Sequence, residues 1–274
     1  MNIQEIVSIL TNSGIEPNEA NIEVKMLIEH FCNYTAKDII MGKPLDYKKL
    51  EIVKEKAILR AKTKQPIQHI IGFAYFMGNM YKVTPDVLIP RDETELVVRH
   101  AIDIIKTNNL KTVLDIGTGT GCIACAIAQN TNCEILSIDI SENALHVADT
   151  NIHTLGIKNV TLKHSNLFSN ISHETFDLII SNPPYIPLGT ELQKEVQFEP
   201  KTALFTTEET GTEFYKKIIE QGAKYLNNNG FIVFELGIKQ ANIVKKLFEQ
   251  HNYTDVKIEH DFANIERIIS AKLN

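Results

Sequence analysis

The sequence has no excess of positive charge, no long apolar run and no paired cysteine motif of the zinc-binding type. Its 28 lysines and arginines are outnumbered by 34 aspartates and glutamates, giving a net charge of −6. Stable binding to a phosphate backbone relies on clustered positive side chains, so nucleic acid is not an expected partner. No run of about 18 apolar residues occurs, and residues 1–5 lack a basic start before an apolar core. We therefore expect a cytoplasmic protein without membrane contact.

The four cysteines are few and poorly spaced for metal binding. Cys122 and Cys125 form one isolated C-x-x-C, without the second pair that a zinc site needs, and we expect no metal. Both lie in an apolar helical stretch, so we interpret them as buried thiols rather than a redox pair. No internal repeat appears, and 274 residues with 43% hydrophobic content suffice for one full domain and a smaller one.

Helical spacing dominates the N-terminal part of the chain. Apolar residues repeat with a helical period over 3–10, 20–31 and 50–61, and Thr35 to Asp38 resembles the cap of a short helix ending near Gly42. Two β-prone segments then flank Gly78-Asn79, which predicts a hairpin. We predict a helical substrate-binding domain over 1–72 and a hairpin linker over 73–88.

From residue 89 to 274, strand patterns alternate with helical patterns, which predicts an α/β domain with a doubly wound, mostly parallel sheet. Asn227 to Gly230 is typical of a turn before the last of the parallel strands. The patterns at 253–259 and 266–272 are joined too closely for a helical crossover, so this last pair should be antiparallel. The expected parallel strands cover 112–116, 134–139, 159–163, 176–181 and 231–235.

A glycine-rich loop, Gly117-Thr118-Gly119-Thr120-Gly121, lies between the first of these strands and a helix. Glycines there let the backbone approach a nucleotide closely. Cys122 stands where a dinucleotide fingerprint would place its third glycine, which disfavours NAD. Asp139 ends the next strand, where a carboxylate can accept both ribose hydroxyls, although it could instead cap the following helix, a role that Ser141 could also fill. S-adenosylmethionine fits best, because its amino-acid end can use the loop and Asp115.

The tetrad Asn182-Pro183-Pro184-Tyr185 follows the predicted strand at 176–181. Two prolines stiffen the backbone and remove two N–H donors, which leaves carbonyls and the Asn182 amide oxygen as acceptors beside an aromatic ring. Such acceptors suit a planar NH2 group whose face packs on Tyr185. The competing interpretation is a tight turn after a strand. The tetrad resembles that of amino-methyltransferases.

Six blocks of the sequence carry a more specific resemblance: residues 66–72, 87–95, 115–121, 181–185, 198–200 and 203–204. Together they resemble the HemK-type family of protein-(glutamine-N5) methyltransferases. This resemblance implies a Rossmann-like methyltransferase sheet behind a small N-terminal helical domain and a hairpin linker. It implies methyl transfer from S-adenosylmethionine to the side-chain amide nitrogen of the glutamine in the Gly-Gly-Gln motif of class I peptide chain release factors, with the release factor as partner.

The resemblance also implies the site residues. Asn182, Pro183 and Tyr185 would be catalytic, and together with Pro184 would bind the substrate amide. Arg91 and Glu199 are further candidates for substrate binding, against a salt-bridged helix start and an exposed loop carboxylate. The family usually has Asp at Asn166 and often an aromatic residue at Leu167, so adenine recognition should differ here. The expected cofactor-binding residues are Asp115, Gly117, Thr118, Gly119, Thr120, Gly121, Asp139, Asn166, Leu167 and Asn182.

Two other functions compete with this one. An amino-methyltransferase acting on an exocyclic base amine of RNA or DNA would present the same planar group to Asn182, but the sequence has no basic stripe or recognition region. A non-catalytic cofactor-binding module would be expected to have a disrupted tetrad or glycine loop, and both are intact. We expect a monomer.

Overall fold

The computed structural model describes residues 2–35, 37–38, 41–44 and 46–274. The chain divides into two compact units. The first runs to Phe73 and also contains Leu192–Phe198, and the second contains Ala74–Glu191 and Glu199–Asn274. The limits predicted from the sequence, 1–72, 73–88 and 89–274, stay a prediction. Nothing in the sequence indicates that Leu192–Phe198 belongs with the N-terminal helices.

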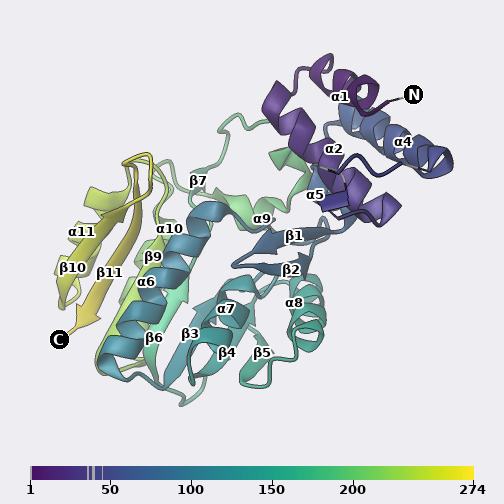
Figure 1. Cartoon of the computed structure of the whole chain (residues 1–274). Helices are drawn as coiled ribbons and strands as arrows, with labels where there is room; N and C mark the ends of the chain where they lie inside the picture. The colour runs from purple at the N-terminus through teal and green to yellow at the C-terminus, as the bar shows by residue number, and fades with distance from the viewer. Residues whose placement is uncertain (1, 36, 39–40, 45) are drawn as a thin grey trace. The chain divides into compact units, whose positions relative to one another are not determined.

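Helices make up most of the first unit, as the apolar spacing predicts (Figure 1). Asn2 and Asp46 cap two of them by accepting hydrogen bonds from the backbone N–H groups of Glu5 and Lys48. The predicted helix at 35–42 includes residues outside the described ones, but Thr35 and Asp38 exchange the expected capping hydrogen bonds. The helices are α1 (Ile3–Thr11), α2 (Pro17–Cys32), α4 (Tyr47–Thr63) and α5 (Ile67–Ile71), followed along the chain by the 3-10 turn η1 (Val196–Phe198) in the distant segment.

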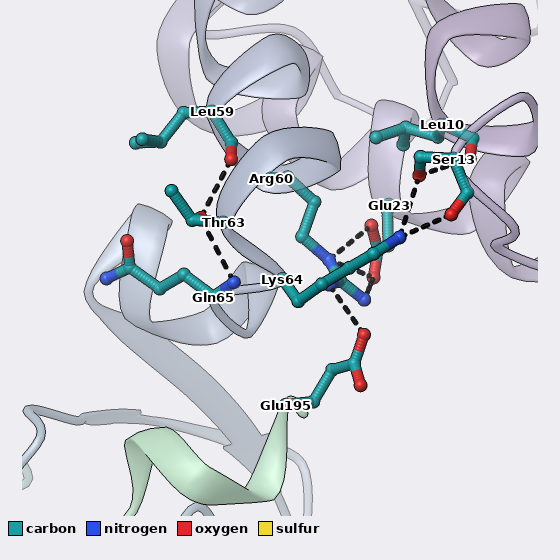
Figure 2. A network of polar contacts seen from close by, with 9 residues as sticks. All are labelled: Leu10, Ser13, Glu23, Leu59, Arg60, Thr63, Lys64, Gln65 and Glu195. Atoms are coloured by element: carbon teal, nitrogen blue, oxygen red, sulfur yellow. Dashed lines mark hydrogen bonds and ion pairs between the residues drawn. The ribbon is translucent and has the colours of Figure 1, made fainter. Parts of the chain in front are cut away.

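A buried ionic network joins the helices of this unit to the segment Leu192–Phe198 (Figure 2). Arg60 is 2% exposed, and its Nη2 lies 3.0 Å from Oε1 of the buried Glu23. Its Nη1 lies 3.0 Å from Oε1 of Glu195. An unpaired buried guanidinium would be costly, and the two carboxylates together accept hydrogen bonds from Nε, Nη1 and Nη2 of Arg60. The segment around Glu195 is therefore held by the helical unit.

A two-stranded hairpin, β1 (Phe73–Phe76) and β2 (Asn79–Lys82), turns at Gly78 as predicted. Its second strand is fastened to α8 (Glu142–Thr154) by Asn151, a buried amide. Asn151 accepts a hydrogen bond of 2.7 Å from the N–H of Lys82 and donates to the carbonyls of Lys82 and Thr120 at 3.1 and 2.9 Å. One side chain thus links the hairpin to the glycine-rich loop.

The second unit is built on a seven-stranded sheet with the order β10-β11-β9-β6-β3-β4-β5 (Figure 1). The five strands from β9 to β5 are parallel, and β11 is antiparallel to both β9 and β10. The predicted α/β class, with its antiparallel last strand, is confirmed. No described helix is long and apolar enough to span a membrane. The strands are β3 (Thr112–Ile116), β4 (Glu134–Asp139), β5 (Val160–His164), β6 (Phe176–Ser181), β9 (Leu226–Glu235), β10 (Tyr253–His260) and β11 (Glu266–Leu273).

Successive residues of the central strands point to opposite faces of the sheet, and each face has its own core. Val113 of β3 packs on one side with α6 (Asp92–Asn108) and α7 (Cys122–Asn130). Leu114, the next residue, packs on the other side with α10 (Glu213–Gly222) and α11 (Ala241–Gln250). Both faces of a parallel sheet must be covered, which is why consecutive apolar residues such as Val113 and Leu114 occur in its central strands. Cys122 and Cys125 are buried within α7, as interpreted from the sequence.

The prediction of a turn at 227–230 is wrong, because these residues lie inside β9. Phe176 pairs with Leu226, whereas Leu178, two residues later, pairs with Phe231, so β9 contains a large bulge. Asn229 has a left-handed φ of 65° there. Asn227 donates a hydrogen bond of 2.7 Å to Asp177 on β6. The turn-forming residues bend the strand instead of ending an element.

Candidate active site

A cavity of about 270 Å³ lies at the carboxyl ends of the parallel strands of the second unit. This is the edge at which open α/β sheets bind ligands. Of the predicted cofactor residues, Gly117, Gly119, Asp139, Asn166, Leu167 and Asn182 line it, whereas Asp115, Thr118, Thr120 and Gly121 do not. Pro183 and Pro184 also line it. The strands thus bring together residues that are far apart in the sequence.

The glycine-rich loop connects β3 to α7 through three residues with positive φ. The values are 76° at Gly117, 55° at Gly119 and 78° at Gly121, a region that side chains with a Cβ adopt at a cost. A Cβ at Gly121 would also lie 3.2 Å from the Cβ of Ala148 on α8, whereas one at Gly117 would meet nothing within 4 Å. Gly121 therefore serves helix packing, and Gly117 leaves the cavity wall open.

Asp139 ends β4 and holds two segments that line the cavity, the glycine-rich loop and the turn that follows β4. Its Oδ2 accepts a hydrogen bond of 2.9 Å from the N–H of Gly119, and its Oδ1 accepts one of 2.9 Å from the N–H of Ser141. Burial raises its pKa against these stabilising bonds. Ser141, and not Asp139, caps α8 by accepting from the N–H of Ala144. The carboxylate keeps free lone pairs for a ligand.

Asp115 lies on β3 beneath the loop and is fully buried. Neither of its oxygens has a hydrogen-bond partner among the described residues. Burial raises its pKa to about 7; the nearby hydroxyls of Thr118 and Ser137 lower it and the charge of Asp139 raises it. These hydroxyls lie beside the carboxyl without closing a well-directed hydrogen bond. Asp115 is thus an acid without a protein counter-charge, next to the cavity.

Asn182 follows β6 and is hydrogen-bonded, directly and through one hydroxyl, to two buried residues for which the sequence analysis predicted no role. Its Nδ2 donates to Oγ1 of Thr94 at 3.3 Å, and that hydroxyl donates to Oε2 of Glu235 at 2.5 Å. The Oδ1 of Asn182 accepts no hydrogen bond from the described residues. Thr94 and Glu235 look like ordinary helix-start and strand-end residues in the sequence, and only their contacts reveal the connection.

Tyr185, the last residue of the tetrad, is held by a hydrogen bond to its backbone and by contacts of its ring with the core. The carbonyl of Tyr185 accepts a hydrogen bond of 2.9 Å from Nε2 of Gln240. The Tyr185 ring packs against the core on the α10 face, and Tyr185 is not among the residues that line the cavity. The carbonyls of Pro183 and Pro184 accept no hydrogen bond from the described residues. The predicted packing of Tyr185 on a substrate amide stays a prediction.

Arg91 and Glu199 form an ion pair in this unit. Glu199 is only 4% exposed, and its second oxygen accepts a hydrogen bond of 2.9 Å from the N–H of Ile89. The expectation of an exposed loop carboxylate at Glu199 is therefore wrong, because both of its oxygens have partners. The partner of Arg91 at the helix start is Glu199, which lies 108 residues away in sequence.

Leu167 has a φ of 49°, which is unusual for a residue with a branched side chain. The hydroxyl of Ser165 holds this turn by donating to the Leu167 carbonyl at 2.6 Å. The amide of Asn166 is exposed beside it. Ile140 and Phe214 are apolar wall residues that sequence reasoning missed. Ile140 is 54% exposed. Its place in the sequence, directly after Asp139, could have identified it as a wall residue.

Known proteins are similar to this chain in fold and in sequence. A sequence model of the methyltransferase small domain family matches residues 94–197. The crystal structure of a methyltransferase from Pyrococcus furiosus has a TM-score of 0.55 and 22% identity, covering 82% of this chain and 98% of that chain. The sheet and the family match define a methyltransferase with a Rossmann-like fold.

Two curated relatives are more specific. A release factor glutamine methyltransferase of Geobacter sulfurreducens is 37% identical over 270 residues, covering 96% of this chain and 93% of that protein. One of Fusobacterium nucleatum is 37% identical over 225 residues, and the match covers 80% of this chain and 63% of that relative. This chain belongs to the release factor glutamine methyltransferase family, and the predicted family is confirmed.

Proposed function

We propose that this protein transfers a methyl group from S-adenosylmethionine to the side-chain amide nitrogen, N5, of the glutamine in the Gly-Gly-Gln motif of class I peptide chain release factors. The observation that carries the proposal is the group of acceptors at the cavity edge, the Oδ1 of Asn182 and the carbonyl of Pro183, which no described donor uses. Two adjacent acceptors match the two N–H bonds of a primary amide. Family membership supports the same substrate class.

S-adenosylmethionine fits the groups that the chain offers. The free lone pairs of Asp139 suit the two ribose hydroxyls, and the apolar side chains of Ile140 and Leu167 suit a purine ring. Asp115, whose carboxyl has no partner among the described residues, would ionise beside the positive amino group at the other end and stabilise it. When bound, the cofactor supplies an electrophilic methyl group whose leaving group is a neutral thioether.

The residues of the chain then have to orient a poor nucleophile. The amide nitrogen shares its lone pair with the carbonyl, and it reacts only when it is directed at the methyl carbon. Asn182 and Pro183 would hold its two N–H bonds, and such alignment can lower a barrier by roughly 7–11 kcal/mol. The same acceptors stabilise the positive charge that develops on nitrogen in the transition state. The alkylated nitrogen, being strongly acidic, releases its proton to water.

The helical unit is proposed to bind the release factor. The support is its segment Leu192–Phe198, which in the chain connects the tetrad at 182–185 to Glu199 and the cavity residue Pro200. A protein bound to this unit would act on the connector directly.

The proposed activity is tested by incubating the protein with methyl-labelled S-adenosylmethionine, an intact class I release factor and total cellular nucleic acid. We expect the label on the side-chain amide of one glutamine of the release factor, located by mass spectrometry. Label in RNA or DNA alone would overturn the proposal in favour of a base amino-methyltransferase.

Substitution of Asn182 tests the amide acceptor. Asn182→Ala should lower turnover of the release factor by about 10²–10³-fold at saturating cofactor, as for loss of one oriented transition-state contact. Asn108→Ala, which removes an exposed amide at the end of α6, is the matched control and should leave turnover unchanged. Near-normal turnover of Asn182→Ala would contradict the role assigned to this side chain.

A further inference from the structure

Asn182 is hydrogen-bonded to Thr94, which in turn is hydrogen-bonded to Glu235. Both residues are buried, and neither lines the cavity. We propose that these two are positioning residues for methyl transfer, because together they fix which end of the Asn182 carboxamide is offered to the substrate. The inference rests on the proposed function of Asn182 as an acceptor for the glutamine amide.

The sheet register brings the two strand ends together. β6 and β9 are parallel neighbours in which Ser181 pairs with Phe234, so Asn182 and Glu235, the next residues, lie at the same edge. Thr94 comes from the first turn of α6 and is 3% exposed, while Glu235 is 2% exposed. Among the described residues, Thr94 is the one that donates a hydrogen bond to the Glu235 carboxyl.

The hydroxyl of Thr94 has a single proton, and this fact determines the orientation of Asn182. Ionised Glu235 is an acceptor only, so the proton lies in the bond of 2.5 Å from Thr94 to Glu235. Only lone pairs of Thr94 then remain for Asn182, which must present its NH2 group, as the 3.3 Å contact shows. The other end of the carboxamide, Oδ1, is left without a partner in the described structure.

A carboxamide turned by 180° would be useless for the proposed reaction. It would present its NH2 group to the NH2 group of the substrate glutamine, and two donors repel. The energies of the two orientations differ little unless a neighbour distinguishes them. Thr94 distinguishes them only while Glu235 fixes its proton, so both residues are needed.

Burial opposes the charge on Glu235 that this arrangement requires. Burial raises its pKa to about 7, the bond from Thr94 lowers it, the nearby Glu93 raises it, and Arg267 and Arg91 lower it. The acid therefore ionises near neutral pH. A buried carboxylate is destabilising unless it accepts hydrogen bonds, and here it accepts one from the Thr94 hydroxyl.

The decisive experiment is a double-mutant cycle with S-adenosylmethionine and an intact class I release factor. Thr94→Val keeps the shape of the side chain and removes the hydroxyl; it should lower kcat about tenfold or more while the dissociation constant for the cofactor stays the same. Thr94→Ser keeps the hydroxyl and should restore kcat to within about threefold of the wild type. In the Asn182→Ala background, Thr94→Val should change kcat by less than about twofold, because the side chain it positions is gone.

A second variant covers the case in which Thr94→Val fails to fold. Glu235→Gln is isosteric but can donate to Thr94, so it no longer fixes the proton and should also lower kcat without changing cofactor binding. Tyr253→Phe is the structural control, because it removes a buried hydroxyl that donates to the carbonyl of Ile219 at 3.2 Å. It should lower thermal stability and leave kcat unchanged.

The outcomes separate this inference from the proposed function. If Asn182→Ala is inactive but Thr94→Val and Glu235→Gln keep wild-type kcat, the positioning role is wrong and the proposed function stands. If Thr94→Val lowers kcat equally in the wild type and in Asn182→Ala, Thr94 acts independently and the inference is also wrong. If Asn182→Ala itself is fully active, the proposed function is contradicted at Asn182, and the inference that rests on it is contradicted as well.

Discussion

At the scale of single residues, Asp115 and Asp177 show how surroundings decide the charge of a carboxyl. Asp115 is buried without a hydrogen-bond donor among the described residues, and its pKa is raised to about 7. Asp177 accepts hydrogen bonds from the N–H groups of Lys111 and Thr112 and from Asn227. These bonds overcome its partial burial, and its pKa is lowered. The two carboxyls should therefore affect stability with opposite dependence on pH.

The prediction at this scale concerns Asp115→Asn. The folded state keeps a proton on Asp115 up to about pH 7, whereas an aspartate in an unfolded chain has its ordinary pKa of 3.8. The stability from this proton is complete below about pH 4 and is lost as pH rises to 7. The unfolding free energy of Asp115→Asn relative to wild type should therefore rise between about pH 4 and 7, by up to roughly 4 kcal/mol over that range, and stay level above it.

Urea unfolding at several pH values measures this difference. Asp177→Asn is the control with the reverse sign, because the stability from Asp177 is present above its unfolded pKa and is lost only as pH falls through its lowered folded pKa. A difference for Asp115→Asn that does not change with pH would show that the carboxyl is not protonated in the folded protein.

At the scale of elements, the hairpin and the glycine-rich loop depend on α8. Asn151 supplies hydrogen bonds to both, and it is 2% exposed. Its loss would leave the carbonyl of Thr120 and both backbone groups of Lys82 without these partners. The loop that lines the cavity is thus positioned by a helix as well as by its own strand.

We predict that Asn151→Ala lowers the free energy of unfolding by about 2–4 kcal/mol, because buried backbone groups lose their partners. It should also weaken S-adenosylmethionine binding, measured by calorimetry, since Thr120 belongs to the loop. Asn159→Ala is the matched control: it removes one amide contact of 2.7 Å to the carbonyl of Cys133. That change should cost about 1 kcal/mol and spare cofactor binding. Normal cofactor affinity in Asn151→Ala would mean that the loop holds its own shape.

At the scale of the whole molecule, the chain crosses between its two units more than once. Leu192–Phe198 leaves the second unit, joins the helical unit through Glu195 and returns at Glu199. Glu199 in turn pairs with Arg91 and accepts from Ile89. The connector that follows the tetrad is therefore held at two places. Glu195 is held by Arg60 in the first unit, and Glu199 is held by Arg91 and Ile89 in the second.

Glu195→Gln tests the importance of the first attachment, because it removes the charge that meets Arg60 and keeps the Glu23–Arg60 pair. We predict that methylation of the intact release factor falls by up to about fivefold: Glu195 is partly exposed and Gln keeps an acceptor for Arg60, so the lost charge is worth about 1 kcal/mol. Cofactor affinity should not change. Glu174→Gln, which breaks an exposed ion pair with Lys163, is the control expected to have no effect. Reduced cofactor affinity in Glu195→Gln would contradict this division of roles.

Much of the architecture could be predicted because local patterns encode it. Helical spacing located α1, α2 and α4, and apolar runs located the parallel strands. Parallel strands end at one edge, so placing Asp139 and Asn182 at strand ends was enough to place them at one cavity. The bulge at Asn227 to Gly230 was missed, because turn-forming residues are also the residues that kink a strand.

The sequence by itself therefore determined the fold class, the family and some of the residues that line the cavity, since these follow from the spacing of side chains along the chain. Only the tertiary structure decided the partners of Arg60, Arg91 and Thr94, which lie 135, 108 and 141 residues away at Glu195, Glu199 and Glu235. A charged residue is expected to be exposed until its counter-charge is known. Packing brings such distant groups together, and the low polarity of the interior then requires that they be paired.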